Sequence, residues 1–115
     1  STIQAIRKVY NSSIPIEVFY IGDEDLSAKS RLLLEKIPFV KTHNLFDSFN
    51  QKILRIEGFL AKPYSILASS FQEVILMDAD TNFLYSPDKF FDSDVYKDKG
   101  TLFWKDRTLR ILQLV

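Results

Sequence analysis

The feature that most constrains the fold is an apolar run, VILM at residues 74–77, which lies between a helical pattern and two acidic residues. A continuous run without polar alternation is typical of a strand that is buried on both faces in a parallel sheet. The residues before it are apolar at helical spacings of three and four. These are Leu60, Tyr64, Leu67, Ala68 and Phe71. A helix followed by a buried strand over residues 73–77 predicts an α/β fold.

Helical and extended signals alternate along the rest of the chain, as an α/β fold requires. Residues 14–21 (IPIEVFYI) are rich in β-branched and aromatic side chains, which favours a strand, and Gly22 ends it. The remaining predicted elements are a helix from Ile3 to Tyr10, a helix over residues 23–37, a short strand over 39–44, a helix over 45–56, a turn or short helix over 88–91 and a strand over 101–104.

Composition and length exclude several classes of protein. Fifteen basic and fifteen acidic side chains balance, so the chain as a whole carries no electrostatic signal for nucleic acid or anionic lipid. The absence of cysteine excludes disulfides, thiolate metal sites and cysteine nucleophiles. The chain of 115 residues opens directly on a helix and closes on an apolar stretch. We therefore expect residues 1–115 to be a single incomplete domain of a larger protein.

The sharpest chemical signal is Asp78-Ala79-Asp80, directly after the predicted buried strand. In open α/β sheets, ligands bind beyond the carboxyl ends of the strands, and two carboxylates one residue apart can hold a hard divalent cation there. Two acidic residues that simply begin a loop are the alternative interpretation. A further alternative is a phosphatase of the haloacid-dehalogenase type, whose motif is D-x-D-x-T/V. Asn82 occupies the last position of that motif here, and Thr81 comes one residue too early. A nucleotide-sugar transferase fits better, because its two acids hold a metal that bridges the donor diphosphate.

Four motifs occur in order along nearly the whole chain. They are residues 14–27 (IPIEVFYIGDEDLS), residues 62–80 (KPYSILASSFQEVILMDAD), the pairs Phe83-Leu84, Ser86-Pro87 and Phe90-Phe91, and residues 100–107 (GTLFWKDR). Together they resemble the fungal α-1,3-mannosyltransferases of glycosyltransferase family 71. The resemblance implies a partial GT-A fold, which is Rossmann-like with a mostly parallel sheet flanked by helices. It also implies a GDP-mannose donor, Mn²⁺, and retention of the anomeric configuration. Members are type II membrane proteins of the Golgi that act in protein glycosylation on the lumenal side.

The resemblance also assigns site residues. Asp78 and Asp80 match the metal and donor-diphosphate site, with Asp80 as the expected direct metal ligand. Lys62 lies sixteen residues before Asp78, the spacing at which related retaining enzymes such as glycogenin keep a donor-binding lysine. An ordinary solvated lysine is the alternative. The resemblance assigns no catalytic residue. We expect a mannan or glycoprotein glycan as acceptor, a membrane anchor outside these residues, and no transfer by residues 1–115 alone.

Other candidate residues have structural explanations that need no function. Helix capping accounts for the acidic residues after Gly22, and Asp106-Arg107 fits a surface pair. His43 is the only histidine, which excludes a histidine cluster and favours a surface or partly buried position. Asn11-Ser12-Ser13 is a glycosylation sequon that a lumenal enzyme could use. The rival interpretation of the whole chain is a non-catalytic remnant or pseudoenzyme that keeps the fold and binds a partner.

Overall fold

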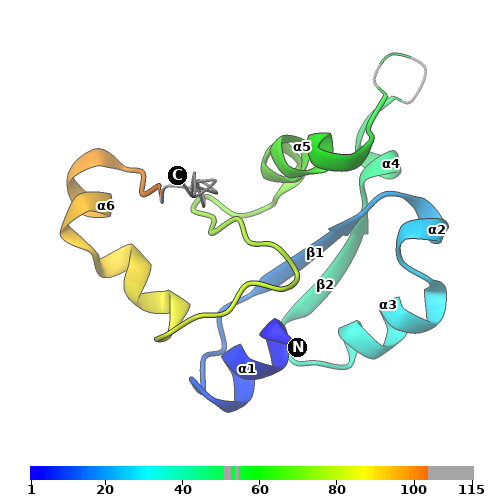
Figure 1. The fold of residues 1–115 in the computed structure, drawn as a ribbon. Helices are drawn as coiled ribbons and strands as arrows, with labels where there is room; N and C mark the ends of the chain where they lie inside the picture. Colours follow the sequence, from blue (N-terminus) through cyan, green and yellow to red (C-terminus); the bar gives the residue numbers. More distant parts are fainter. Residues whose placement is uncertain (51–52, 54, 104–115) are drawn as a thin grey trace, which may run out of the picture. The chain divides into compact units, whose positions relative to one another are not determined.

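The computed structural model describes residues 1–50, 53 and 55–103 of the chain (Figure 1). The chain divides into two units, Ser1–Asn82 and Phe83–Val115. No helix among the described residues is long and apolar enough to cross a membrane.

The first unit is built around two parallel strands, β1 (Ile16–Tyr20) and β2 (Val40–Asn44). Their register pairs Ile16 with Val40 at one end and Tyr20 with Asn44 at the other. Two helices, α2 (Gly22–Asp25) and α3 (Ala28–Glu35), connect the strands (Figure 1). The predictions of strands over residues 14–21 and 39–44 are confirmed, and the connection is the βαβ unit that parallel strands require.

The single helix predicted over residues 23–37 is two helices in the structure. Leu26 has an extended backbone, with φ −140° and ψ 110°, and this interrupts the helix. Ser27 then begins α3 as its N-cap, because its hydroxyl accepts a hydrogen bond from Ser30 N at 3.2 Å. Acidic residues at 23–25 therefore stabilise only the short α2.

In the described part of the first unit, three more α-helices and one 3₁₀ turn accompany the sheet. Helix α1 (Thr2–Lys8) confirms the helix that the apolar stripe predicts near the start of the chain, and a capping box between Ser1 and Gln4 begins it. Helix α4 (Leu45–Ser48) ends well before the predicted bound at residue 56, because Phe49 has an extended backbone. A 3₁₀ turn, η1 (Gly58–Leu60), leads into α5 (Ala61–Ala68), which confirms the predicted helix there. The buried apolar residues are Ile6, Ile16, Tyr20, Val40, Leu45 and Ile56.

The prediction of a buried strand over residues 73–77 is wrong. These residues form no strand, and Val74 and Leu76 are 38% and 47% exposed. A strand is defined by backbone hydrogen bonds to a neighbouring strand, whereas an apolar run reports only a tendency to bury side chains. Within the described residues, the sheet contains β1 and β2 alone. The α/β class is confirmed, because two parallel strands are connected and flanked by helices. This arrangement is consistent with part of a Rossmann-like fold.

The second unit contains the 3₁₀ segment η2 (Pro87–Asp92) and helix α6 (Asp94–Lys99). The first confirms the turn predicted over residues 88–91. Helix α6 was not predicted, although Ser93 caps its first turn and Gly100 ends it with φ +73°. Residues 101–103 are not a strand, contrary to prediction. Trp104, Asp106 and Arg107 lie outside the described residues.

Candidate functional site

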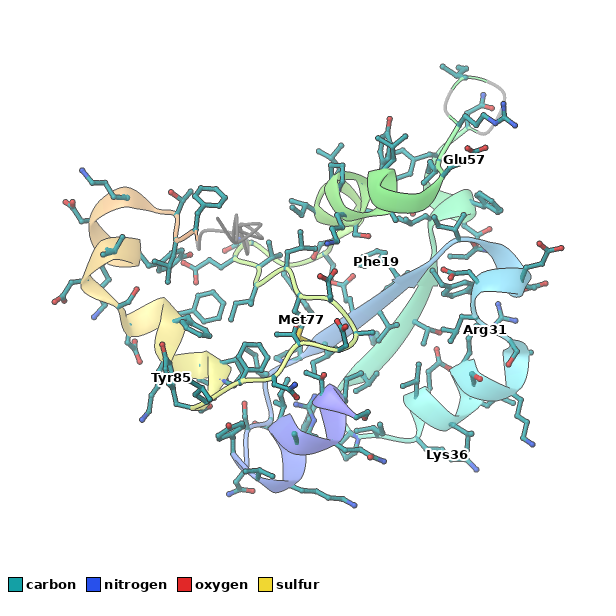
Figure 2. The ribbon with its side chains drawn as sticks, viewed as in Figure 1. Phe19, Arg31, Lys36, Glu57, Met77 and Tyr85 are labelled. Carbon is teal, nitrogen blue, oxygen red and sulfur yellow. The ribbon has the colours of Figure 1, made fainter. Side chains whose placement is uncertain are left out.

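Asp78 and Asp80 lie in one tight turn at the end of the coil segment that contains Met77 (Figure 2). The turn is closed by a hydrogen bond in which Thr81 N donates to Asp78 O at 3.1 Å. Ala79 and Asp80 are the central residues of this turn, and all of residues 78–80 are exposed. The turn therefore presents both carboxylates to solvent with one residue between them.

Thr2 holds the turn from the first residue of α1. Its hydroxyl lies 2.9 Å from Ala79 O and 2.6 Å from Thr81 O, so its single proton is shared between two carbonyl oxygens of the turn. The Thr2 residue is buried, with 8% of its surface exposed. Sequence reasoning missed this residue, because a threonine at the start of a helix resembles an ordinary capping residue.

The structure brings Lys62 and Asp78 together. Lys62 Nζ lies 2.7 Å from Asp78 Oδ1, and the two side chains are 47% and 55% exposed. Lys62 stands in the first turn of α5, followed by Pro63, which is accepted there because first-turn N–H groups have no helical partner. The lysine that the spacing singled out is thus an ion-pair partner of the first acidic residue, with about half of its side chain exposed to solvent.

The chemistry of Asp78 and Asp80 fits a hard divalent cation, although they supply only part of a coordination sphere. Carboxylate oxygens are the ligands that Mg²⁺ and Ca²⁺ prefer, and such ions take about six to eight oxygen ligands. Among the described residues, no group of three or more histidine, cysteine, aspartate or glutamate side chains is placed to hold a metal. Any ion held by these two carboxylates would complete its coordination with water, with substrate oxygens or with groups outside the described residues.

The carboxyl ends of β1 and β2 are held together by Gly22 and Asn44. Gly22 N donates to Asn44 Oδ1 at 3.1 Å, and Phe46 N donates to the same oxygen at 3.0 Å. Gly22 has φ +71°, and a Cβ atom there would lie 2.8 Å from Phe46 Cε2. Only glycine fits both the backbone conformation and the approach of the ring.

The acidic residues after Gly22 provide the favourable first-turn charge that the sequence predicts, but the prediction that they cap the helix is wrong, because the N-cap of α2 is Ile21 and no side chain caps it. Asp25 Oδ2 accepts a hydrogen bond from Ile21 N at 2.9 Å. Asp23 Oδ1 lies 2.8 Å from Arg31 Nη1, which also donates to the Tyr20 hydroxyl at 2.6 Å (Figure 2). The hydrogen bond to Tyr20 and the neighbouring Asp23 raise the pKa of Arg31 above its ordinary value. Asp23 thus links α2 to α3, and Asp25 links α2 to the residue that follows β1.

Comparison with known proteins finds mannosyltransferases. The family described as "Mannosyltransferase putative" matches residues 1–113. The "Alpha-1,2-mannosyltransferase MNN22" of Candida albicans is 33% identical over 116 residues, which cover 88% of this chain and 18% of that protein. The "Putative alpha-1,3-mannosyltransferase MNN12" of the same organism is 40% identical over 74 residues, covering 64% of this chain and 9% of that protein.

A relative from a second fungus agrees. The "Probable alpha-1,3-mannosyltransferase MNT4" of Saccharomyces cerevisiae is 28% identical over 121 residues, covering 93% of this chain and 20% of that protein. The chain therefore spans about a fifth or less of the length of the curated relatives it matches. No solved structure matches the chain. The match over residues 1–113 shows that the chain belongs to this mannosyltransferase family.

Proposed function

We propose that residues 1–115 are the donor- and metal-binding part of a longer, metal-dependent mannosyltransferase. In this proposal the enzyme transfers mannose from GDP-mannose to a mannose-containing glycan with retention of configuration. Family membership supports the reaction class. The observation that best supports the site is the contact of Lys62 with Asp78, which lies in the same turn as Asp80. It gathers, at one exposed place, the charges that a nucleoside diphosphate and its metal would need.

The three side chains have complementary roles in this proposal. Asp78 and Asp80 offer carboxylate oxygens to Mn²⁺, which when bound neutralises the developing charge on the departing diphosphate. Lys62 carries a compact positive charge with three donors, so it can exchange its carboxylate partner for a phosphate oxygen. Because the Lys62–Asp78 pair is about half exposed, separating it costs little, on the order of 0–1 kcal/mol.

A transfer assay on the full-length protein tests the proposal. We expect mannose to be transferred from GDP-mannose to a mannan acceptor, with little transfer from UDP-glucose and none after Mn²⁺ is removed by chelation. Readdition of Mn²⁺ should restore the rate. Equal transfer before and after chelation would exclude the role given to Asp78 and Asp80. Absence of transfer and of donor binding in the full-length protein would instead favour a non-catalytic remnant.

The product linkage is a separate part of the proposal. The resemblance of the four motifs supports an α-1,3 linkage, whereas three of the matched relatives are named as α-1,2-mannosyltransferases. Methylation analysis of the product distinguishes 3-linked from 2-linked mannose. We expect 3-linked mannose in the α configuration. A 2-linked product would correct the linkage, and a β-linked product would exclude retention.

We further propose a lumenal, Golgi location with a type II membrane anchor outside residues 1–115. The family membership supports a secretory-pathway enzyme. The sequon at residues 11–13 is compatible with it, because Asn11 is exposed in the turn after α1, with φ +50°. A shift in mobility after endoglycosidase treatment, lost in Asn11→Gln, would show that this segment enters the lumen. Immunofluorescence with a Golgi marker checks the compartment.

A further inference from the structure

We propose that Glu17, the second residue of β1, is a positioning residue for the site formed by Lys62 and Asp78. This inference rests on the proposed function, because it concerns the same site. Glu17 belongs to a cluster of four polar residues to which neither the metal chemistry nor the resemblance assigns a role. The other members are His43, Ser69 and Ser70.

Glu17 is a buried carboxylate with several donors. Its side chain is only 5% exposed. Oε1 accepts hydrogen bonds from Ser69 Oγ at 3.1 Å, from Ser70 N at 3.1 Å and from Ser70 Oγ at 2.9 Å. Oε2 lies 3.3 Å from His43 Nε2 on β2 and 3.5 Å from Ser70 N. A buried charge is destabilising unless donors surround it, so these contacts hold the serines firmly.

The sheet directs Glu17 away from α3. Side chains alternate along a strand, so Glu17 and Phe19 lie on the face opposite Ile16 and Tyr20. Arg31 of α3 donates to Tyr20, which places α3 on that other face. His43 is itself held in place, because its ring stacks on Phe19 with centroids 5.3 Å apart and an interplanar angle of 28°. The carboxylate is thus fixed by both strands on the face that receives the end of α5.

Ser69 and Ser70 connect α5, which carries Lys62, to the coil segment that carries Asp78. Ser69 is the C-cap of α5, and Lys62 stands in the first turn of the same helix, roughly 10 Å away along its axis at about 1.5 Å per residue. Ser70 begins the segment that ends in Asp78. Glu17 therefore holds the junction between α5 and the segment that leads to Asp78, and these are the two segments that meet at the 2.7 Å contact between Lys62 and Asp78.

The test compares Glu17→Gln and Ser70→Ala with Glu35→Gln in the full-length protein. Glu35 is a matched control, because its carboxylate accepts from Thr42 N and Thr42 Oγ1 on the other face of the sheet. We expect amide hydrogen exchange over residues 70–78 to become at least about fivefold faster in Glu17→Gln and Ser70→Ala, and to be unchanged in Glu35→Gln. Ser70→Thr keeps the hydroxyl and should restore slow exchange.

Kinetics provide the readout that a merely stabilising residue would not change. We expect the KM for GDP-mannose to rise about tenfold in Glu17→Gln and Ser70→Ala, at a temperature well below each variant's Tm, with the KM for the acceptor unchanged. Equal rises in both KM values, or an unchanged donor KM, would overturn the positioning role. Unchanged exchange over residues 70–78 would overturn it as well. If the parent protein transfers no mannose, the proposed function fails while the exchange measurement still decides the role of Glu17. Ser70→Ala decides it if Glu17→Gln does not fold.

Discussion

Lys62 and Asp78 are sixteen residues apart in the sequence and 2.7 Å apart at their charged atoms. Sequence reasoning could single out both residues, one by its spacing and the other by the D-x-D pattern. It could not foresee Thr2 or Glu17, because a lone hydroxyl or carboxylate has no local pattern. Their roles depend on contacts with residues 79 and 81 in one case and 69 and 70 in the other. Such long-range contacts are a property of the fold alone.

Replacing Lys62 by alanine should strengthen the binding of the metal and weaken the binding of the donor. Removal of the ammonium group 2.7 Å from Asp78 takes away a competing cation, so the affinity for Mn²⁺ in the absence of donor should rise about threefold. The KM for GDP-mannose should rise about tenfold, because the diphosphate loses a positive partner. Metal titration and donor kinetics measure the two effects. Lys29→Ala, an exposed lysine on α3, is the control and should change neither. An unchanged donor KM would return Lys62 to the role of a solvated lysine.

Glu35 should make stability depend on pH in the acidic range. Hydrogen bonds from the Thr42 side chain and backbone lower the pKa of Glu35 below its ordinary value of 4.5. A lowered pKa in the folded state means that the stabilisation is fully present above about pH 4.5 and is lost as the pH falls through the folded pKa. The Tm of the parent should fall in that window more steeply than the Tm of Glu35→Gln. Parallel Tm curves for the two proteins would contradict this assignment.

Elements differ in how far the sequence determines them. The sequence predicts β1 from β-branched and aromatic residues that Gly22 ends, and it predicts β2 in the stretch that follows Pro38. Both signals are local. The strand over residues 73–77 was not formed, because pairing depends on a neighbouring strand that no local pattern reveals. The break between α2 and α3 was hidden for a similar reason. The extended backbone at Leu26 leaves no mark in the local sequence pattern, which allows one helix over residues 23–37.

Gly22→Ala should destabilise the end of β1 more than the same change at Gly58. Both glycines have positive φ, +71° and +53°, so alanine is strained at each. Only at Gly22 would the new methyl group meet the Phe46 ring, at 2.8 Å, whereas nothing lies within 4 Å at Gly58. We expect losses of about 1 kcal/mol for Gly58→Ala and about 2–4 kcal/mol for Gly22→Ala in the free energy of unfolding. Chemical denaturation measures both, and equal losses would show that the ring moves aside freely.

Thr2→Val should loosen the turn that carries Asp78 and Asp80. Valine keeps the shape of threonine but cannot donate to Ala79 O or Thr81 O, so one shared hydrogen bond is lost from a buried position. The expected decrease in the free energy of unfolding is about 1 kcal/mol, with weaker Mn²⁺ binding. Thr2→Ser retains the hydroxyl and should stay close to the parent. Metal affinity in Thr2→Val equal to that of the parent would show that α1 does not hold the turn.

At the scale of the whole molecule, the chain is a βαβ unit with flanking helices and a second unit from residue 83 onward. Its family membership covers residues 1–113, while it spans about a fifth or less of the matched relatives. The order of the four motifs was enough to predict the family. The sheet that the resemblance implied exceeds what the described residues form, since two strands are paired within them.

The central claim is that Asp78 and Asp80 hold the metal for mannose transfer. Its most direct test is the Mn²⁺-dependent rate of transfer from GDP-mannose by the full-length protein carrying Asp80→Ala. Glu24→Ala, an exposed acid on α2, is the matched control. We predict a loss on the order of 100-fold or more in Asp80→Ala, with a Tm close to the parent because the side chain is exposed, and a normal rate in Glu24→Ala. A rate in Asp80→Ala within a factor of two of the parent would contradict the account.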